Sequence, residues 1–258
     1  MRYLKGFYMA LGMFCAIPLP FHVWDVKLTA VMVAALPLVG AIIGAIWWAA
    51  GLLLVAISPP LMLAAAMLTI IPFLIAGFIH LDGFMDTSDA LLSRRDARER
   101  LRILKDPHVG AFAVIMLVIL FLLQFAAAYS IIEGGGRYLA LLIVICILSR
   151  GCSALCILVL RHMPESNYAA ALGQKTSMAN KIFVIMICLG AIAAAALYAG
   201  LAGLIVSAVV LLSYGLAMGR VYKSFNGVSG DLLGYSMVIS ELCGLMALAL
   251  LQGVTLWF

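Results

Sequence analysis

Three aspartates in one short polar segment have the spacing of residues on a single helix face. Asp82, Asp86 and Asp89 stand at positions i, i+4 and i+7, which on an α-helix places their side chains within about 60° of one another. Carboxylates at this spacing repel one another and destabilise a helix. The arrangement becomes favourable when a cation lies among them. We therefore predict that these three residues are metal ligands.

The type of ligand restricts which metal such a site holds. Carboxylate oxygens without cysteine or clustered histidine suit Mg²⁺, Mn²⁺ or Ca²⁺ rather than Zn²⁺. A magnesium ion bound by two or three carboxylates usually also binds a phosphate of the substrate. The segment is therefore typical of an enzyme that acts on a phosphate-containing substrate. The alternative is an acidic face that is merely solvated beyond a membrane helix.

Several arginines follow the aspartates and are the nearest residues that could neutralise them. If the helix continued, its spacing would point these arginines away from the aspartates, toward phosphate, anionic lipid or another helix. The arginines in question are Arg94, Arg95, Arg98 and Arg102.

Further polar residues flank the aspartates. His80 precedes the first of them and is a candidate proton acceptor or phosphate ligand. Lys105 and Asp106 stand in a turn that Pro107 sets, because the residue before a proline disfavours helix. Lys105 is a candidate phosphate ligand, and Asp106 is a candidate metal ligand or base. Helix capping and interfacial anchoring explain these residues equally well.

Two regions farther along the chain also carry candidate residues. The glycine-rich stretch 226–234 contains Gly230 and Asp231; exposed backbone amides can cradle phosphates, although a loop between helices is the default explanation. Arg150 lies midway along one apolar run and Glu241 a few residues inside another, where a charge is costly and normally paired. These two residues either pair with each other or bind an anionic substrate and take up protons.

The composition indicates what kind of elements position these residues. Hydrophobic residues make up 66% of the 258 positions, charged residues 10%, and the mean hydropathy is +1.20, whereas soluble domains are about half apolar and about a quarter charged. The chain is therefore predicted to be an all-α integral membrane protein, with residues 1–258 forming a single transmembrane catalytic domain. The net charge of +5 is interpreted as loop charge that sets orientation, and no nucleic-acid partner is expected.

Seven apolar runs approach the roughly 20 residues that a spanning helix needs. Turn signals separate several of them: the prolines after Ser58, the glycines after Glu133, and the glycines from Gly200 onward. The predicted spans are residues 29–57, 61–79, 111–132, 138–160, 182–199, 202–218 and 237–257.

Seven spans place alternate connections on the same side of the membrane. Of the 16 lysines and arginines, 14 then fall in the amino-terminal segment and in connections 80–110, 161–181 and 220–236. Only Arg137 falls on the other side, and Arg150 lies within a span. Because positive residues gather on the cytoplasmic side, we expect a multi-pass protein of the cytoplasmic (inner) membrane with a cytoplasmic active face.

The chain resembles the cobalamin synthase (adenosylcobinamide-GDP ribazoletransferase) family along its length. The resemblance lies in the acidic block at 80–90 and 98–101, the Lys-Asp turn at 104–112, a glycine signature followed by an acid at 227–241, and an early proline segment at 18–20. The sequence departs from the family at Cys15-Ala16, where Thr-Arg is often found. That position therefore receives no role.

The resemblance implies a reaction and its partners. A hydroxyl of α-ribazole, or of its 5′-phosphate, attacks the phosphorus attached to cobinamide in adenosylcobinamide-GDP. GMP leaves and the nucleotide loop of the corrinoid closes. Such enzymes lie in the lipid bilayer and need a divalent cation, usually Mg²⁺, with Mn²⁺ as the alternative; homo-oligomerisation stays open. The implied catalytic residues are His80, Asp82, Asp86 and Asp89, and the implied substrate-binding residues are Lys105, Asp106, Arg150, Gly230, Asp231 and Glu241.

Two other functions remain to be weighed against this one. A membrane transporter would use Arg150 and Glu241 as pathway residues, and it predicts two related halves with broken helices, which the sequence does not display. A second alternative is another enzyme of the CDP-alcohol phosphotransferase type, whose paired-aspartate motif the acidic block partly matches. The acidic cluster on the basic side favours an enzyme.

Overall fold

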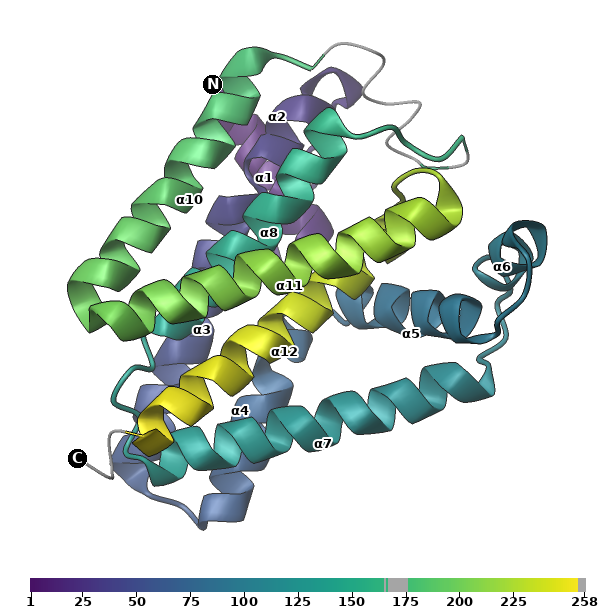
Figure 1. Cartoon of the computed structure of the whole chain (residues 1–258). Coiled ribbons are helices and arrows are strands. Elements are labelled where there is room, and N and C mark those ends of the chain that lie inside the picture. The colour runs from purple at the N-terminus through teal and green to yellow at the C-terminus, as the bar shows by residue number, and fades with distance from the viewer. Residues whose placement is uncertain (165, 167–175, 255–258) are drawn as a thin grey trace.

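The computed structural model describes residues 1–164, 166 and 176–254, and in this part of the chain it consists of helices joined by short connections (Figure 1). One isolated β-bridge, between His162 and Val228, lies outside the helices. The helices are α1 (Arg2–Phe14), a short 3-10 helix η1 (Val26–Leu28), α2 (Thr29–Ala34), α3 (Leu36–Ile57), α4 (Leu61–Ala76), α5 (Ile79–Leu92), α6 (Ala97–Ile103), α7 (Ala111–Glu133), α8 (Leu141–Val159), α10 (Met178–Ala199), α11 (Leu201–Phe225) and α12 (Gly230–Val254).

The predicted class, an all-α polytopic membrane protein, is confirmed. Six described helices are long and apolar enough to cross a membrane, namely α3, α7, α8, α10, α11 and α12, and the bent pair α4 and α5 brings the number to seven if it forms one span. The span predicted at 29–57 is interrupted at Ala35, which separates α2 from α3. The last span begins at Gly230 rather than at 237; its predicted end at 257 lies outside the described residues.

The second predicted span, 61–79, is wrong at its end. Helix α4 stops at Ala76, and α5 leaves it at an angle of 96°. Two successive residues in the left-handed region make the bend: Gly77 has φ +67° and Phe78 has φ +61°. Glycine adopts such angles freely, whereas for phenylalanine they are uncommon. The apolar run therefore continues past Ala76, although helix α4 does not. The bend sets the direction of α5, which carries the aspartates.

A proline inside α4 provides the contact that holds α4 to α3. Pro72 has no amide hydrogen, so it cannot bond the carbonyl oxygen of Leu68 four residues earlier. The buried Trp47 of α3 donates its indole N–H to that oxygen at 2.7 Å. Because a buried carbonyl needs a partner, the Trp47 indole replaces the amide donor that Pro72 lacks, and this hydrogen bond joins α3 to α4.

Two glycines allow α3 and α8 to pack with their backbones in close contact. An added Cβ at Gly40 would lie 2.3 Å from the carbonyl oxygen of Cys146, and one at Gly44 would lie 2.6 Å from the Cα of Ile143. Small residues four positions apart are a common means of helix association in membranes. This close crossing places the middle of α8, which carries Arg150, in the interior of the bundle.

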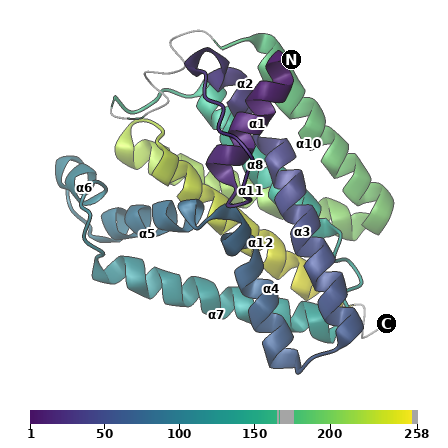
Figure 2. The same cartoon turned by 180° about the vertical axis from the view of Figure 1, so that it is seen from behind.

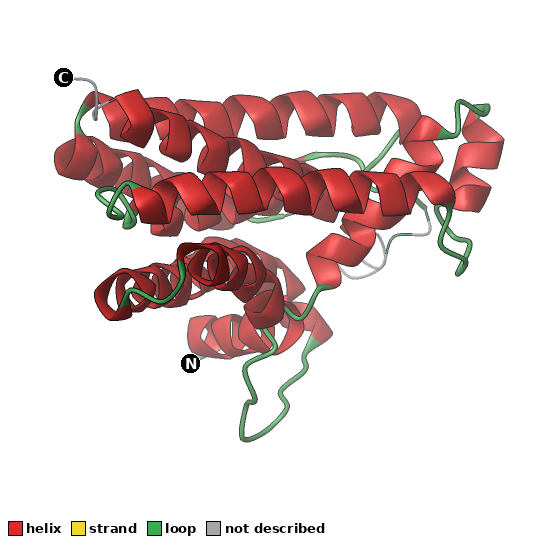
Figure 3. Ribbon diagram, turned by 90° about the horizontal axis from the view of Figure 1, so that it is seen from below, coloured by secondary structure: helices red, strands yellow, loops and turns green. Residues whose placement is uncertain are grey.

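The connections gather at two ends of the bundle in the order that the sequence predicts. In Figures 1 and 2, the amino terminus, α6 and the connection between α11 and α12 lie toward one end, whereas the α3–α4, α7–α8 and α10–α11 connections lie toward the other. Seen from below, the two labelled termini lie in different groups of helices (Figure 3). Helix α5 runs beside α7 and α12 toward the basic end (Figure 2).

The expectation that Arg94 to Arg102 continue the aspartate helix is wrong. Helix α5 ends at Leu92, Arg94 takes a left-handed φ of +53°, and α6 begins only at Ala97. Helical spacing therefore does not relate these arginines to the aspartates. Arg102 instead forms an exposed ion pair with Glu99, at 2.7 Å, within α6.

Candidate functional site

Helix α5 has one apolar face and one face that carries the three aspartates. One side packs against α4, α7 and α12 in an apolar cluster that contains Leu81 and Phe84, and the Phe84 ring stacks on Tyr235 of α12 at 5.7 Å. Of the three aspartates, Asp82 is exposed, and Asp86 and Asp89 are half-buried. The predicted helix is confirmed, and its packed face fixes the direction of its acidic face.

A fourth carboxylate reaches this site from α12. Gly83 of α5 lies against the backbone of Asp231, where an added Cβ would meet the Asp231 Cα at 2.7 Å. Gly234 in turn lies against the backbone of His80, where an added Cβ would be 3.1 Å from the carbonyl oxygen. The glycines at 83 and 234 therefore allow α5 and α12 to cross with their backbones in close contact.

The glycine-rich stretch is not the long loop that the sequence predicts. Helix α11 continues to Phe225 and α12 begins at Gly230, so that only residues 226–229 connect them. Gly230 and Asp231 therefore belong to a helix start, where a carboxylate is stabilised by the helix dipole. The pattern Ser229-Gly230-Asp231 is itself a helix-start signal, and it could have placed Asp231 on a helix.

We expect Gly83→Ala to be destabilising and to impair the site. The new Cβ would meet the Asp231 backbone, which cannot rotate away, so α5 and α12 must separate at a cost of about 1–3 kcal/mol. Because this shift moves Asp231 away from the aspartates of α5, turnover should fall by roughly 10²-fold. Thermal unfolding in detergent and kcat measure the two effects. Gly219→Ala, in open space on α11, is the matched control, and equal behaviour of the two variants would contradict the packing argument.

The neighbouring carboxylates lie close enough to Asp86 to affect its ionisation. Burial, and then the charges of Asp82, Asp231 and Asp89, raise the pKa of Asp86 to about 6. Among the described residues, none of the four forms an ion pair with a lysine or arginine. Within the described part of the chain, the cluster is therefore an accumulation of negative charge without an ion-pair partner.

Asp89 connects the cluster to the Lys-Asp turn. Its carboxylate lies directly against Gly110, where an added Cβ would fall 2.0 Å from an Asp89 oxygen. Asp106, which precedes this glycine by four residues, is exposed; its carboxylate accepts a hydrogen bond from the His108 backbone N–H at 3.0 Å and lies 2.7 Å from the His108 Nδ1. These bonds lower the pKa of Asp106. The structure thus places Asp106 in a local turn, and Lys105 beside it is exposed.

The residues of the cluster fit a divalent cation by donor type. Four carboxylates from two helices supply only hard oxygen atoms, the ligands that Mg²⁺ and Mn²⁺ prefer. Within the described residues, no group of three or more acidic, histidine or cysteine side chains is already gathered around one point. Carboxylates that repel one another move apart when no cation lies among them, so we expect side-chain rotations when a cation binds.

The pKa of Asp86 gives a pH prediction for the metal-free protein. Since this pKa is raised from 3.8 to about 6, the folded state binds more protons than the unfolded chain between these values. Stability should therefore fall as the pH rises from about 4 to 6. In chelator, the unfolding temperature of the native protein should fall more steeply across this window than that of Asp86→Asn. If the unfolding temperatures of the two proteins changed equally with pH, the raised pKa of Asp86 would be contradicted.

His80 lies under the cluster, inside the protein. The side chain is buried, and its Nε2 has no hydrogen-bond partner among the described residues. Burial and then the charge of Arg150 lower the pKa of His80 to about 3. The imidazole is therefore uncharged at neutral pH and too weak a base to serve as the principal proton acceptor.

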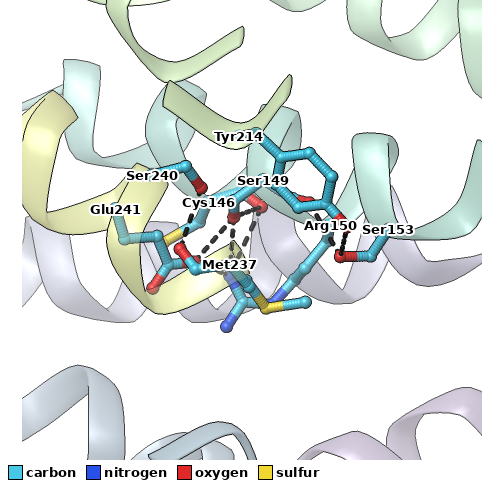
Figure 4. Close-up of polar contacts among 8 residues, drawn as sticks. All are labelled: Cys146, Ser149, Arg150, Ser153, Tyr214, Met237, Ser240 and Glu241. Atoms are coloured by element: carbon cyan, nitrogen blue, oxygen red, sulfur yellow. Dashed lines mark hydrogen bonds and ion pairs between the residues drawn. The ribbon is translucent and has the colours of Figure 1, made fainter. Parts of the chain in front are cut away.

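Arg150 and Glu241 form a buried ion pair, as one of the two interpretations of the sequence predicts. The guanidinium Nη1 of Arg150 donates to a carboxylate oxygen of Glu241, and Ser149 donates to the same oxygen at 2.6 Å (Figure 4). Beside them, the hydroxyl groups of Ser153 and Tyr214 lie 2.9 Å apart. The side chain of Arg150 is only 2% exposed, and its Nε has no hydrogen-bond partner among the residues that the structure describes. The pair joins α8 to α12 in the interior of the bundle.

Comparisons with known proteins agree on one family. A family model described as cobalamin-5-phosphate synthase matches residues 6–249. An adenosylcobinamide-GDP ribazoletransferase of Clostridium botulinum is 37% identical over 252 residues, covering 95% of this chain and 97% of that protein. Proteins with the same name from Clostridium perfringens, 36% identical with 96% and 99% coverage, and Geobacillus kaustophilus, 34% identical with 89% coverage of both chains, are also similar. No solved structure matches the chain.

Proposed function

The chain belongs to the cobalamin-5-phosphate synthase family, and we infer from this membership that it is an adenosylcobinamide-GDP ribazoletransferase whose reaction takes place at the carboxylates of α5 and α12. A hydroxyl oxygen of α-ribazole, or of its 5′-phosphate, attacks the phosphorus that is linked to cobinamide. The bond from this phosphorus to GMP breaks, and GMP leaves. The single observation that carries the site is the convergence of Asp231 on the three aspartates of α5 at the Gly83 crossing.

The carboxylates are proposed to hold a divalent cation, Mg²⁺ or Mn²⁺. Asp82, Asp86 and Asp89 are the candidate ligands from α5, and Asp231 is the candidate ligand from α12. A bound cation would supply charge neutralisation for the diphosphate and for the departing phosphate oxygen. The supporting observations are the oxygen-only donor set and the raised pKa of Asp86, which burial and then the charges of the neighbouring carboxylates cause.

The protein's own residues have separate tasks in this proposal. The proton of the attacking hydroxyl passes to a carboxylate of the cluster, because burial and the nearby Arg150 leave His80 a weak base. His80 instead offers an uncharged ring nitrogen for positioning. Lys105 and the amides at the start of α12, Gly230 among them, are proposed to contact phosphate oxygens.

Arg150 and Glu241 receive a supporting task in place of a transport pathway. Since each satisfies the other's charge in the interior of the bundle, the pair fixes α12 on α8 and so sets the position of Asp231. Direct contacts of Arg150, Glu241 and Asp106 with the substrate stay predictions. Family membership favours the transferase over a transporter.

The membrane location follows from the six long apolar helices, and the orientation is part of the proposal. The acidic cluster lies toward the end of the bundle where the basic connections gather (Figure 1). Because basic residues favour the cytoplasmic side, the active face is proposed to be cytoplasmic, in the inner membrane, where it meets soluble substrates.

The transferase assignment predicts specific products. The purified protein in detergent or nanodiscs, with adenosylcobinamide-GDP, α-ribazole and Mg²⁺, should yield adenosylcobalamin and GMP in equal amounts. Chelation of the metal should stop both products, and Mn²⁺ should restore them. Folded protein that gives no product under these conditions would overturn the transferase assignment. Product that persists in chelator would overturn the role of the metal only.

A further inference from the structure

A pocket of about 270 Å³ extends from the carboxylates into the interior of the protein. Asp82 and Asp231 line it together with residues of α1, α3, α8 and α12. Ser153, Ser166 and Ser229 add hydroxyl groups to its walls, and the apolar side chains important for the argument are Phe14, Leu36, Ile157 and Met237. Any molecule that occupies this pocket therefore has one part beside the carboxylates and another part among apolar side chains.

His80 gives the pocket a buried polar group. The residue is 9% exposed and lines the pocket, and its Nε2 has no hydrogen-bond partner in the part of the chain that the structure describes. Its ring stacks on Phe14 of α1, with centroids 6.3 Å apart and planes at 15°, and its backbone is held against Gly234. A buried polar atom without a partner is costly because its lost hydration is not replaced. A ligand that bonds to Nε2 would recover this cost.

The size and the walls of the pocket discriminate among the parts of the substrates. At about 270 Å³ the pocket is slightly smaller than the roughly 300–1,000 Å³ typical of sites for drug-sized ligands, so it can hold one base and its sugar but not a corrin ring. A guanine base carries several polar groups on its edges, and those that face the apolar side chains would stay unpaired at high cost. A benzimidazole base has apolar edges and one free ring nitrogen.

We propose that this pocket binds the ribazole nucleoside, with its benzimidazole base among Phe14, Leu36, Ile157 and Met237 and its ring nitrogen hydrogen-bonded to His80. The inference rests on the proposed function and deepens it by assigning one of the two substrates to one place. The sugar end then lies toward Asp82 and Asp231, where the attacking hydroxyl is needed. The corrinoid and its GDP approach the carboxylates from outside the pocket.

Steady-state kinetics with each substrate varied in turn test this assignment. Phe14→Ala, and His80→Phe, which keeps an aromatic ring but removes the nitrogen, should each raise the KM for α-ribazole at least about tenfold. The KM for adenosylcobinamide-GDP should change less than twofold. Phe7→Ala, at a partly buried phenylalanine of α1 that does not line the pocket, is the matched control and should change neither KM.

Each outcome tests the pocket assignment separately from the transferase assignment. If the native protein makes product but the two variants raise the KM for adenosylcobinamide-GDP instead, or change neither KM, the pocket assignment is wrong and the transferase assignment stands. Equilibrium dialysis of α-ribazole against the native protein in chelator needs neither variant nor turnover. Saturable binding that benzimidazole riboside displaces, and guanosine does not, is expected; displacement by guanosine alone would overturn the assignment even if both variants failed to fold.

Discussion

Asp86→Asn is expected to lower kcat by about 10³-fold or more while the protein remains folded in the membrane. The substitution keeps the size of the side chain and removes a half-buried charge from the middle of the carboxylate cluster. A cation that stabilises charge in the transition state contributes several kcal/mol, and about 4 kcal/mol corresponds to a factor of roughly 10³ in rate. The initial rate of GMP release at saturating substrates measures the effect.

The stability of Asp86→Asn shows whether this variant has lost a metal ligand or has failed to fold. Because Asp86 is repelled by three neighbouring carboxylates, its neutral replacement should leave the unfolding temperature in chelator unchanged or raise it. Mg²⁺ should then stabilise the variant less than the native protein. Glu133→Gln, an exposed carboxylate at the other end of the bundle, should have neither effect. Turnover of Asp86→Asn within threefold of native would contradict a role for Asp86 in metal binding.

Breaking the Arg150–Glu241 pair should cause the largest loss of stability of any single substitution considered. Arg150→Met leaves the Glu241 carboxylate without its cation in the interior of the bundle, next to Ser149. Removal of one member of a buried ion pair typically costs about 3–5 kcal/mol. We expect a clear fall in the unfolding temperature in detergent and a reduced yield of inserted protein.

The double variant distinguishes the pair from general packing. Arg150→Met combined with Glu241→Leu removes both charges, so it should recover much of the stability that either single substitution loses. Arg137→Met, at an exposed arginine, is the matched control and should change the unfolding temperature little. If the losses of the two single substitutions simply add in the double variant, the two side chains do not act as a pair.

The local parts of the site were predictable from the sequence because they depend on helical geometry alone. The i, i+4, i+7 spacing placed three aspartates on one face of α5, and the structure has a helix over these residues. The pairing of Arg150 with Glu241 was one of two stated interpretations, because a charge inside an apolar run needs a partner.

The long-range parts were not predictable because they depend on packing between distant segments. The 96° bend between α4 and α5 falls inside a continuous apolar run, and Phe78 gives no sign in the sequence that it will adopt a left-handed conformation. The position of Asp231 beside the α5 aspartates follows from the crossing of α5 and α12. The stacking of Phe14 on His80 likewise joins two helices whose relation the sequence does not state.

Binding of Mn²⁺ to the purified protein, followed by electron paramagnetic resonance, tests the central claim most directly. If the carboxylates of α5 and α12 hold the cation, the native protein should bind Mn²⁺ in competition with Mg²⁺. Asp86→Asn and Asp231→Asn should each weaken this binding at least about tenfold, and Glu133→Gln should leave it unchanged. Undiminished Mn²⁺ binding in both aspartate variants would contradict the claim.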